Sequence, residues 1–405
     1  MRTGRPRSLL VLLLALVMLG ATAGQRAHLP EDGLITEPGY RAAATYVASG
    51  QARADQLWLE TGTVPGSGTR WADMARWALV DLRSFLSPNG TVAAGPGGPW
   101  KKFWPRDGSF AAVALSRSGH HEEAAQILDR LARLEFDPVV GFQARYRLDG
   151  SPLSDRPRQS DGCGWVLWAI KEVRAEDPAG VPASAAGLRD RCVRTLTTLV
   201  GAGSRLPPPS PDYWELPVDR TCLGTVAPMV AGLTAAADDY RATGQATEAA
   251  AVGAVGARLG RVVARSFGPD YERFGSKGGV DAAVAMLLPP FRNQGGAQTD
   301  RAVRGAWLRY QHKALQPAGG LAPGADWTAR DGASWTPETA LVALTAAATH
   351  DDKTAQRWLD WLDAHRTAYG SLPEKVTRTG RPAGPAPLVW TAALTLLTLH
   401  ELDQH

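Results

Sequence analysis

The chain has 405 residues, with 44 Lys and Arg against 40 Asp and Glu, and 44% of its residues are hydrophobic. This composition excludes a disordered chain, a fibrous repeat and a small disulfide-stapled module. A net charge of +4 is small for this length, so we expect no nucleic-acid partner.

The N-terminus has the features of a secretory signal peptide over residues 1–23. Basic residues at Arg2, Arg5 and Arg7 precede an apolar run over 9–19, which ends before Ala21-Thr22-Ala23. A run of about 11 residues is too short to span a bilayer, which needs roughly 20. We therefore expect cleavage near Ala23, a secreted protein and no stable membrane span.

Export permits disulfide bonds, and the chain has three cysteines, Cys163, Cys192 and Cys222. One bridge would leave one thiol over, and the sequence does not choose among the three pairings. Three small buried residues are an equally good interpretation.

From residue 67 onward, hydrophobic periodicity predicts helices of two alternating kinds. Helices of the first kind carry charges on one face and should lie at the surface; they cover 67–87, 120–134, 185–202, 245–267, 298–314 and 351–367. Helices of the second kind are nearly uncharged and should be buried on all sides; they cover 107–118, 162–175, 221–240, 278–288, 337–350 and 387–400.

Six buried helices alternating with six surface helices predict an all-α protein built as an (α/α)6 barrel over 67–405. The N-terminal segment 24–66 should add one helix over 37–62, and no linker separates a second domain. The long connections all precede buried helices, so they should meet at one end of the barrel. Long ordered loops on a rigid scaffold commonly carry functional sites.

Six tryptophans fall in these loops or in the first turn after them: Trp100, Trp104, Trp165, Trp214, Trp327 and Trp335. Aromatic rings stack on the C–H faces of sugars, and they equally serve as packing. Both interpretations stay open from the sequence.

The loops also hold many carboxyl groups. Asp107 and Asp161 stand at helix starts, where a carboxylate can cap free N–H groups. Glu215 follows two aromatic residues, a setting able to raise the pKa of a carboxyl as a general acid requires. Glu374 adjoins Lys375 and should stay ionised, as a general base must. Two carboxyls in unlike surroundings suit glycoside hydrolysis, although chemistry alone makes this pair one choice among many.

Other chemistries have less support. The eight His show no ligand spacing, so we expect no metal. There is no P-loop and no G-x-S-x-G motif, and we expect no cofactor. The expected partner is an oligosaccharide or polysaccharide substrate, and the sequence leaves the oligomeric state open.

Four loop segments, in the same order and spacing, resemble glycoside hydrolase family 15, the glucoamylase family, over about residues 67–400. They are Phe103-Trp104-Pro105-Arg106-Asp107-Gly108, Arg156-Pro157-Arg158-Gln159-Ser160-Asp161-Gly162, Asp212-Tyr213-Trp214-Glu215 and Leu372-Pro373-Glu374. The segment Ser334-Trp335-Thr336-Pro337-Glu338-Thr339 is also similar to a family segment.

The resemblance implies an (α/α)6 barrel and an exo-acting, inverting enzyme that releases glucose from non-reducing ends. It makes Glu215 the general acid and Glu374 the general base, with Arg106 and Asp107 holding the terminal glucose. For inversion, the two carboxyls should lie roughly 6.5–9.5 Å apart. Further candidates for substrate contact lie in the same segments: Trp104, Asp161, Trp214 and Trp335.

The chain departs from the family pattern in segments that contact sugar. Leu216-Pro217 stands where the family often has a second acidic residue. We therefore expect short α-glucosides, or a linkage other than α-1,4, to be cut better than starch. One alternative is a catalytically inactive exported carbohydrate-binding protein on the same barrel. Another is a terpene cyclase or prenyltransferase-type barrel, which would need an acidic cluster or zinc site that is not visible.

Overall fold

The computed structural model describes Leu34–Ile35 and residues 50–292, 296–327 and 331–405. The predicted signal peptide and the first part of the predicted helix over 37–62 lie outside these residues. The chain divides into Met1–Gly33 and Leu34–His405, and all described residues belong to the second unit. Among the helices of the described residues, none combines the length and hydropathy that a bilayer crossing requires.

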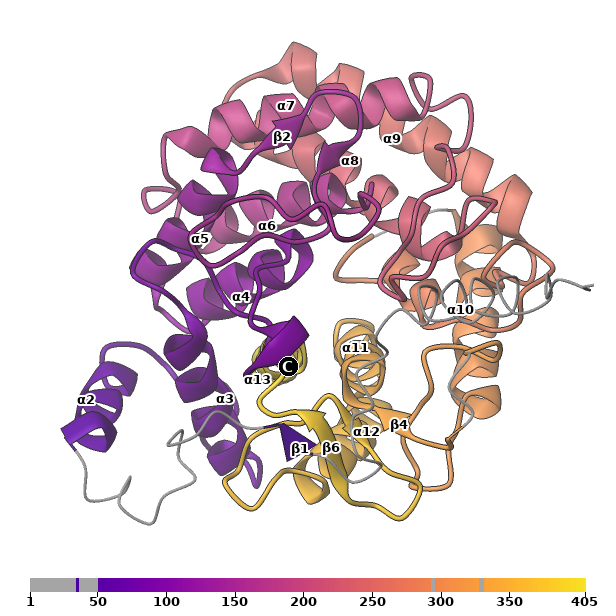
Figure 1. Ribbon diagram of the computed structural model, residues 1–405. Helices are drawn as coiled ribbons and strands as arrows, with labels where there is room; N and C mark the ends of the chain where they lie inside the picture. The colour runs from indigo at the N-terminus through magenta and orange to yellow at the C-terminus, as the bar shows by residue number, and fades with distance from the viewer. Residues whose placement is uncertain (1–33, 36–49, 293–295, 328–330) are drawn as a thin grey trace, which may run out of the picture. The chain divides into compact units, whose positions relative to one another are not determined.

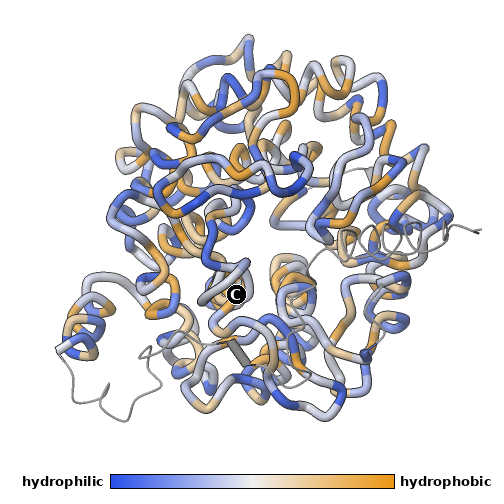
Figure 2. The backbone as a smooth tube through the Cα atoms, viewed as in Figure 1, coloured by the Kyte–Doolittle hydropathy of each residue, from blue (hydrophilic) through white to orange (hydrophobic). Residues whose placement is uncertain are grey.

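Surface helices and buried helices alternate along the chain. The surface helices are α3 (Ala72–Phe85), α5 (His121–Arg133), α7 (Ser184–Leu199), α9 (Ala246–Phe267), α10 (Ala297–Lys313) and α12 (Asp352–Ala364). The buried elements are α4 (Pro105–Arg117), α6 (Gly162–Glu176), α8 (Leu223–Ala242), the 3-10 helix η2 (Ala282–Leu287), α11 (Thr336–Ala347) and α13 (Val389–Asp403). Hydrophilic and hydrophobic stretches are interspersed along the outer helices (Figure 2).

The buried elements form a closed inner ring. In chain order each contacts the next, from α4 through α6, α8, η2 and α11 to α13, and α13 returns to contact α4. Each surface helix packs on the inner element beside it, as α5 does on α4 and α12 on α11 (Figure 1). All twelve residues of α11 are buried, which explains why its sequence is predominantly apolar, with Glu338 as its one charged residue. This architecture is the predicted (α/α)6 barrel.

One predicted inner helix is wrong in kind. The segment 278–288 forms only η2, a short 3-10 helix, in place of an α-helix. Gly278 and Gly279 have φ values of 90° and 69°, which keeps the first two residues out of a right-handed helix. Pro289 and Pro290 follow the segment and cannot continue it. Apolar composition predicted burial correctly, but the flanking residues leave too little length for an α-helix.

Several elements lie outside the double ring. Helix α2 (Gly50–Leu59) packs on α3, and η1 (Gly98–Trp100) is a single turn in the loop before α4. Short strands, which periodicity did not indicate, tie loops together: β1 (Leu34–Ile35), β2 (Phe136–Asp137), β3 (Gly141–Phe142), β4 (Ser334–Trp335), β5 (Lys375–Val376) and β6 (Pro382–Pro385). β2 pairs with β3, while β4, β5, β6 and β1 form a separate sheet. The antiparallel β4–β5 pair joins the loops that precede α11 and α13.

A disulfide bond joins Cys163 of the inner helix α6 to Cys192 of the surface helix α7. Cys222 is a buried free thiol. The structure thereby selects one of the three pairings that the sequence left open. The bridge fixes an inner helix to its surface partner two residues after Asp161.

We expect Cys192→Ala to lower the free energy of unfolding more than Cys222→Ala does, although both side chains are fully buried. The bridged residues are 29 apart, and a cross-link over such a loop stabilises by about 3.5 kcal/mol in the chain-entropy model. Denaturant titration of both variants and the wild type measures the difference. Equal losses in the two variants would contradict a stabilising role for the bridge.

Candidate active site

The long loops precede the inner elements, and their side chains contact one another across the end of the barrel. The loops cover 86–104, 134–161, 200–222, 268–281, 314–335 and 365–388. Each predicted site residue lies in one of them or in the following first turn. Contacts between the loops therefore decide which of these residues come together.

Two tryptophans of the loop before α4 hold the two candidate catalytic carboxyls, which belong to two other loops. The indole Nε1 of Trp104 donates a hydrogen bond to Oε1 of Glu215 over 2.6 Å. The indole Nε1 of Trp100, four residues earlier, donates to Oε1 of Glu374 over 2.9 Å. An indole is a rigid donor with no acceptor. These bonds therefore place Glu374 at one end of the segment Trp100–Trp104 and Glu215 at the other.

Glu215 sits on a tight turn with unusual backbone geometry. Its φ of 56° lies in the left-handed region, which is uncommon outside glycine and costs on the order of 1–3 kcal/mol. The turn is held by Asp212, whose carbonyl accepts from the Glu215 N–H over 2.8 Å and whose Oδ1 accepts from the Trp214 N–H over 3.1 Å. Such strain persists where surrounding contacts impose it, and it often marks a functional residue.

A buried ionic network anchors this turn. Arg273 donates to Asp212 over 2.8 Å and to Asp281 over 3.0 Å, and its guanidinium lies 3.7 Å from the ring centre of Trp214. Tyr213 donates its hydroxyl to Asp281 over 2.7 Å. The loops before α8 and η2 are therefore joined by charge-assisted hydrogen bonds.

The surroundings of Glu215 differ from those that the sequence suggested. Beside the aromatic residues, Arg156 forms an ion pair with Glu215. The Arg156 side chain is 35% exposed, whereas that of Glu215 is 14% exposed. The cation and the Trp104 N–H both stabilise a charged carboxylate. Aromatic neighbours alone thus do not define this environment.

Glu374 is the more deeply buried carboxyl, with 9% exposure. Burial raises its pKa, and Lys375 and the Trp100 N–H oppose the shift without cancelling it. Lys375 alone therefore does not set the electrostatic environment of this carboxyl. Gly384, with φ of 74°, approaches so closely that a Cβ atom there would lie 2.8 Å from Oε2 of Glu374, so only glycine fits.

An aromatic chain connects the loop of Glu215 with that of Glu374. Trp214 contacts Trp327 edge-on at 4.9 Å between ring centres, and Trp327 contacts Trp335 at 5.0 Å. Trp335 pairs with Lys375 through the β4–β5 ladder. The indole nitrogens of all three tryptophans are buried without a hydrogen-bond partner among the described residues. Unpaired donors of this kind suit a ligand rich in hydroxyl groups.

Trp165 differs from the other loop tryptophans. It is fully buried and packs against Phe110 and Trp168 at ring-centre distances of 5.0 and 6.2 Å. Its indole Nε1 donates to Oδ2 of Asp161 over 3.3 Å. Trp165 is therefore a packing residue that also orients a carboxyl.

Arg106, Asp107 and Asp161 form a buried charged group where α4 and α6 begin. Nη2 of Arg106 lies 2.9 Å from Oδ2 of Asp107, while its Nε and Nη1 have no partner among the described residues. Burial raises the pKa of Asp107, and it raises that of Asp161 to about 6, against the opposing charge of Arg106. Asp161, the N-cap residue of α6, makes no side-chain capping hydrogen bond. Asp107 lies at the third position of α4, where its carboxyl accepts a hydrogen bond from its own backbone N–H.

Sequence reasoning gave no role to several residues that the structure brings to these groups. Arg156 and Glu338 lie inside the motifs that resemble the family. Their position in these motifs could have marked them as candidate site residues. Trp390 of α13 carries no such signal, yet the Arg106 guanidinium lies 4.4 Å from its ring centre. Among the described residues, no group of His, Cys, Asp and Glu could hold a metal ion.

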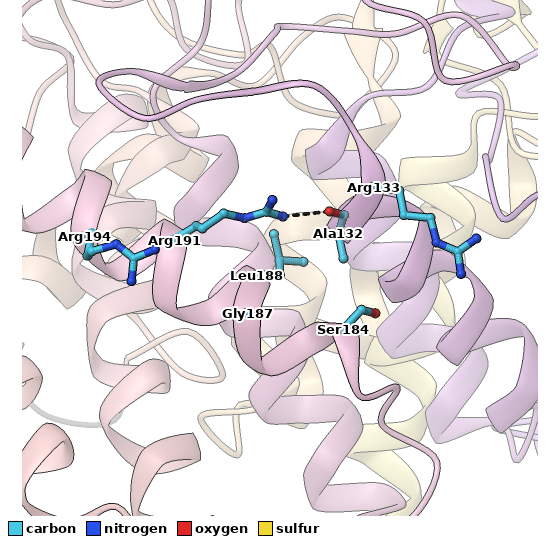
Figure 3. Close-up of a pocket in the computed structure, with 7 residues that line it drawn as sticks. All are labelled: Ala132, Arg133, Ser184, Gly187, Leu188, Arg191 and Arg194. Atoms are coloured by element: carbon cyan, nitrogen blue, oxygen red, sulfur yellow. Dashed lines mark hydrogen bonds between the residues drawn. The ribbon is translucent and has the colours of Figure 1, made fainter.

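A groove on the outer surface, between α5 and α7, is separate from these residues. It is lined in part by Arg133, Arg191 and Arg194. Arg191 donates to the carbonyl of Ala132 over 2.7 Å, and the guanidinium groups of Arg133 and Arg194 lie at opposite sides of the groove (Figure 3). The arginines do not converge on one point, and none of the predicted site residues lines the groove.

No family model matches the chain, but solved structures with the same fold do. A glycosidase in complex with glucose superposes with a TM-score of 0.71 at 22% identity, over 82% of this chain and 96% of that one. The glucoamylase of Saccharomycopsis fibuligera superposes with a TM-score of 0.63 at 14% identity, over 93% and 99%. The fold is that of the glucoamylases, and the predicted (α/α)6 barrel is confirmed.

Sequence comparison also points to the glycoside hydrolases. An isomaltose glucohydrolase of Kribbella flavida is 26% identical over 336 residues, which are 74% of this chain and 84% of the relative. The resemblance to the glucoamylase-like family is thereby confirmed, and the protein is a glycoside hydrolase.

We expect Trp100→Phe to move the acidic limb of the kcat/KM–pH profile to higher pH by roughly one unit. The indole N–H favours the charged form of Glu374, so its loss raises the pKa of that carboxyl further. The resemblance implies that the reaction needs ionised Glu374. On acidification the variant should therefore lose activity at a higher pH than the wild type does. Initial rates over a pH series measure the limb.

Trp58→Phe is the matched control, because the Trp58 indole donates to Glu123 over 2.6 Å on the outer surface. It should leave the profile unchanged. An unmoved acidic limb in Trp100→Phe would contradict a role for this bond in holding Glu374 ionised.

Proposed function

We propose that the protein is an inverting, exo-acting glycoside hydrolase that releases glucose from the non-reducing ends of α-glucosides. Glu215 is the general acid and Glu374 the general base. The observation that carries this proposal is the pair of carboxyls held by Trp104 and Trp100. Two carboxyls in unlike surroundings, beside buried donors without partners, are the groups that such hydrolysis needs.

In the first half of the reaction, Glu215 gives a proton to the glycosidic oxygen as the bond to the leaving sugar breaks. To carry that proton, Glu215 must separate from Arg156. The Arg156 side chain is 35% exposed, so an entering sugar can displace its guanidinium toward solvent. Trp104 keeps the carboxyl in place during this change.

In the second half, ionised Glu374 takes a proton from a water that attacks the anomeric carbon from the opposite face. Room for this water requires carboxyls roughly 6.5–9.5 Å apart, and attack from that face turns an α-linkage into β-glucose. The Trp100 N–H bond and the neighbouring Lys375 favour the ionised base.

Buried polar groups around the pair bind the terminal glucose. Arg106 acts with Asp107 and Asp161 on the sugar hydroxyls, and two of its nitrogens have no partner within the described part of the chain. Trp214 and Trp335 offer indole donors and apolar ring surfaces from the other side. A buried donor left unpaired costs about 1–3 kcal/mol, so a hydroxyl that satisfies it gives both affinity and discrimination.

The substrates are short α-glucosides, or glucosides with a linkage other than α-1,4. Leu216, in place of an acidic residue, is partly buried and packs against the hydrophobic core, so it offers no acceptor to the leaving sugar. The relative named an isomaltose glucohydrolase supports this choice. Export through the signal peptide agrees with the Cys163–Cys192 bridge, because such bonds persist in oxidising compartments.

We expect Glu215→Gln and Glu374→Gln each to lower kcat by about 10²–10⁴-fold. Glutamine keeps an oxygen that can accept the indole N–H, so the fold should persist while proton transfer fails. Glucose release is measured beside thermal melting, with Glu135→Gln, an exposed loop carboxyl 52% accessible, as control. A near-wild-type rate in either catalytic variant would assign the role to another residue.

We expect glucose to appear first as the β-anomer, and isomaltose, maltose or trehalose to be cut faster than soluble starch. Attack opposite the leaving group dictates the anomer, and the missing acceptor at Leu216 dictates the preference. Anomer-resolved NMR of early product on these four substrates tests both. An α-anomer would overturn the inverting mechanism, and a strong preference for starch would overturn the choice of substrate.

A further inference from the structure

Glu338 occupies the third helical position of α11, directly after Trp335, Thr336 and Pro337. α4 begins in the same way, with Trp104 before the helix and Asp107 at the third position. Both helices belong to the inner ring, so both carboxyls project from first turns at the loop end of the barrel. The backbone N–H of Thr336 also donates to the carbonyl of Glu374 over 3.0 Å, which links the start of α11 to the base.

Glu338 is as deeply buried as the groups proposed to hold glucose. It is 3% exposed, against 2% for both Asp107 and Asp161. Its Oε2 has no hydrogen-bond partner among the described residues. The nearby hydroxyls of Tyr213 and Tyr310 donate elsewhere, to Asp281 over 2.7 Å and to the carbonyl of Ala322 over 2.7 Å.

Buried carboxyls elsewhere on the inner helices have cationic partners. Glu172 of α6 accepts from Arg117 over 2.6 Å, and Asp239 of α8 accepts from Arg189 over 2.8 Å. The Glu338 carboxyl accepts a hydrogen bond from its own backbone N–H, but among the described residues no cation forms an ion pair with it. Burying such a carboxyl costs stability relative to an apolar side chain of similar size. Structural need therefore does not account for Glu338.

We propose that Glu338 is a further substrate-binding residue, whose carboxyl binds a hydroxyl of the glucose unit held by Arg106. This proposal rests on the proposed function of the site. A glucose hydroxyl both donates and accepts, so it satisfies the unpaired carboxyl oxygen. Glu338 then determines how tightly the terminal sugar is bound, beside the Arg106 and Asp107 pair.

Burial and the carboxylates around Glu338 favour its neutral form. Burial raises the pKa of Glu338 to about 8, with the charges of Glu374 and Asp281 adding to the shift and that of Arg106 opposing it. Tyr213, before α8, and Tyr310, on α10, complete the titratable groups that face it. A neutral carboxyl donates one hydrogen bond and accepts another, which matches a sugar hydroxyl below this pH.

The test compares Glu338→Leu and Glu338→Gln with the wild type, using glucose itself as the probe. Binding is followed by calorimetry, which needs no turnover, and kcat and KM are measured separately on isomaltose. We expect Glu338→Leu to weaken glucose binding and to raise KM by about tenfold or more. Glu338→Gln keeps a donor and an acceptor, so at pH 6 its glucose affinity should stay within a few fold of wild type.

The pH dependence separates binding from a merely structural role. Wild-type affinity for glucose should fall as Glu338 ionises around pH 8, and Glu338→Gln should lose this alkaline fall. Glu172→Gln, a buried glutamate paired with Arg117 on α6, is the matched control. It should alter thermal stability and leave glucose binding and its pH profile unchanged.

Three outcomes would overturn the proposal. In the first, Glu338→Leu folds and binds glucose as the wild type does. In the second, Glu338→Gln retains the alkaline fall, and this result decides the matter when Glu338→Leu does not fold. In the third, the wild type neither binds glucose nor hydrolyses any glucoside, which removes the proposed function as well. An active wild type with unaffected Glu338 variants would overturn this proposal alone.

Discussion

The whole site depends on one short segment, the loop from Trp100 to Trp104. Its two indole N–H groups hold Glu374 and Glu215, although these carboxyls belong to loops 159 residues apart in their numbering. Tryptophan is suited to this task because its donor is fixed on a rigid ring that also excludes water. The segment ends where α4 begins, so the inner ring sets the position of the donors and, through them, of both carboxyls.

Buried charged groups at this end of the barrel are of two kinds, those in ion pairs with Arg273 and those with an unpaired polar atom. Arg273 neutralises Asp212 and Asp281, which holds the strained turn of Glu215 in place. Arg106, Asp107 and Glu338 each keep a buried polar atom without a hydrogen-bond partner among the described residues. Satisfied networks stabilise a structure, whereas unsatisfied buried groups are retained where a ligand completes them.

The inner helices satisfy several of their own buried hydroxyl groups. Thr395 and Thr398 of α13 donate to the carbonyls four residues earlier, each within 2.8 Å, and Ser109 of α4 does the same. Hydroxyls bonded in this way add no unpaired donor to the core.

The sequence by itself determined the alternation of surface and buried helices, the single end at which the loops meet, and, through motif order, the candidate acid and base. The helix alternation and the position of the loops follow from periodicity and spacing, which are local properties of the chain. The candidate acid and base rest on the resemblance of the loop motifs to the glucoamylase family. Only the tertiary structure decided that Cys163 pairs with Cys192 and that Arg156 reaches Glu215. It also decided that burial outweighs Lys375 at Glu374, because burial and hydrogen bonding depend on loops distant in sequence that no local pattern can bring together.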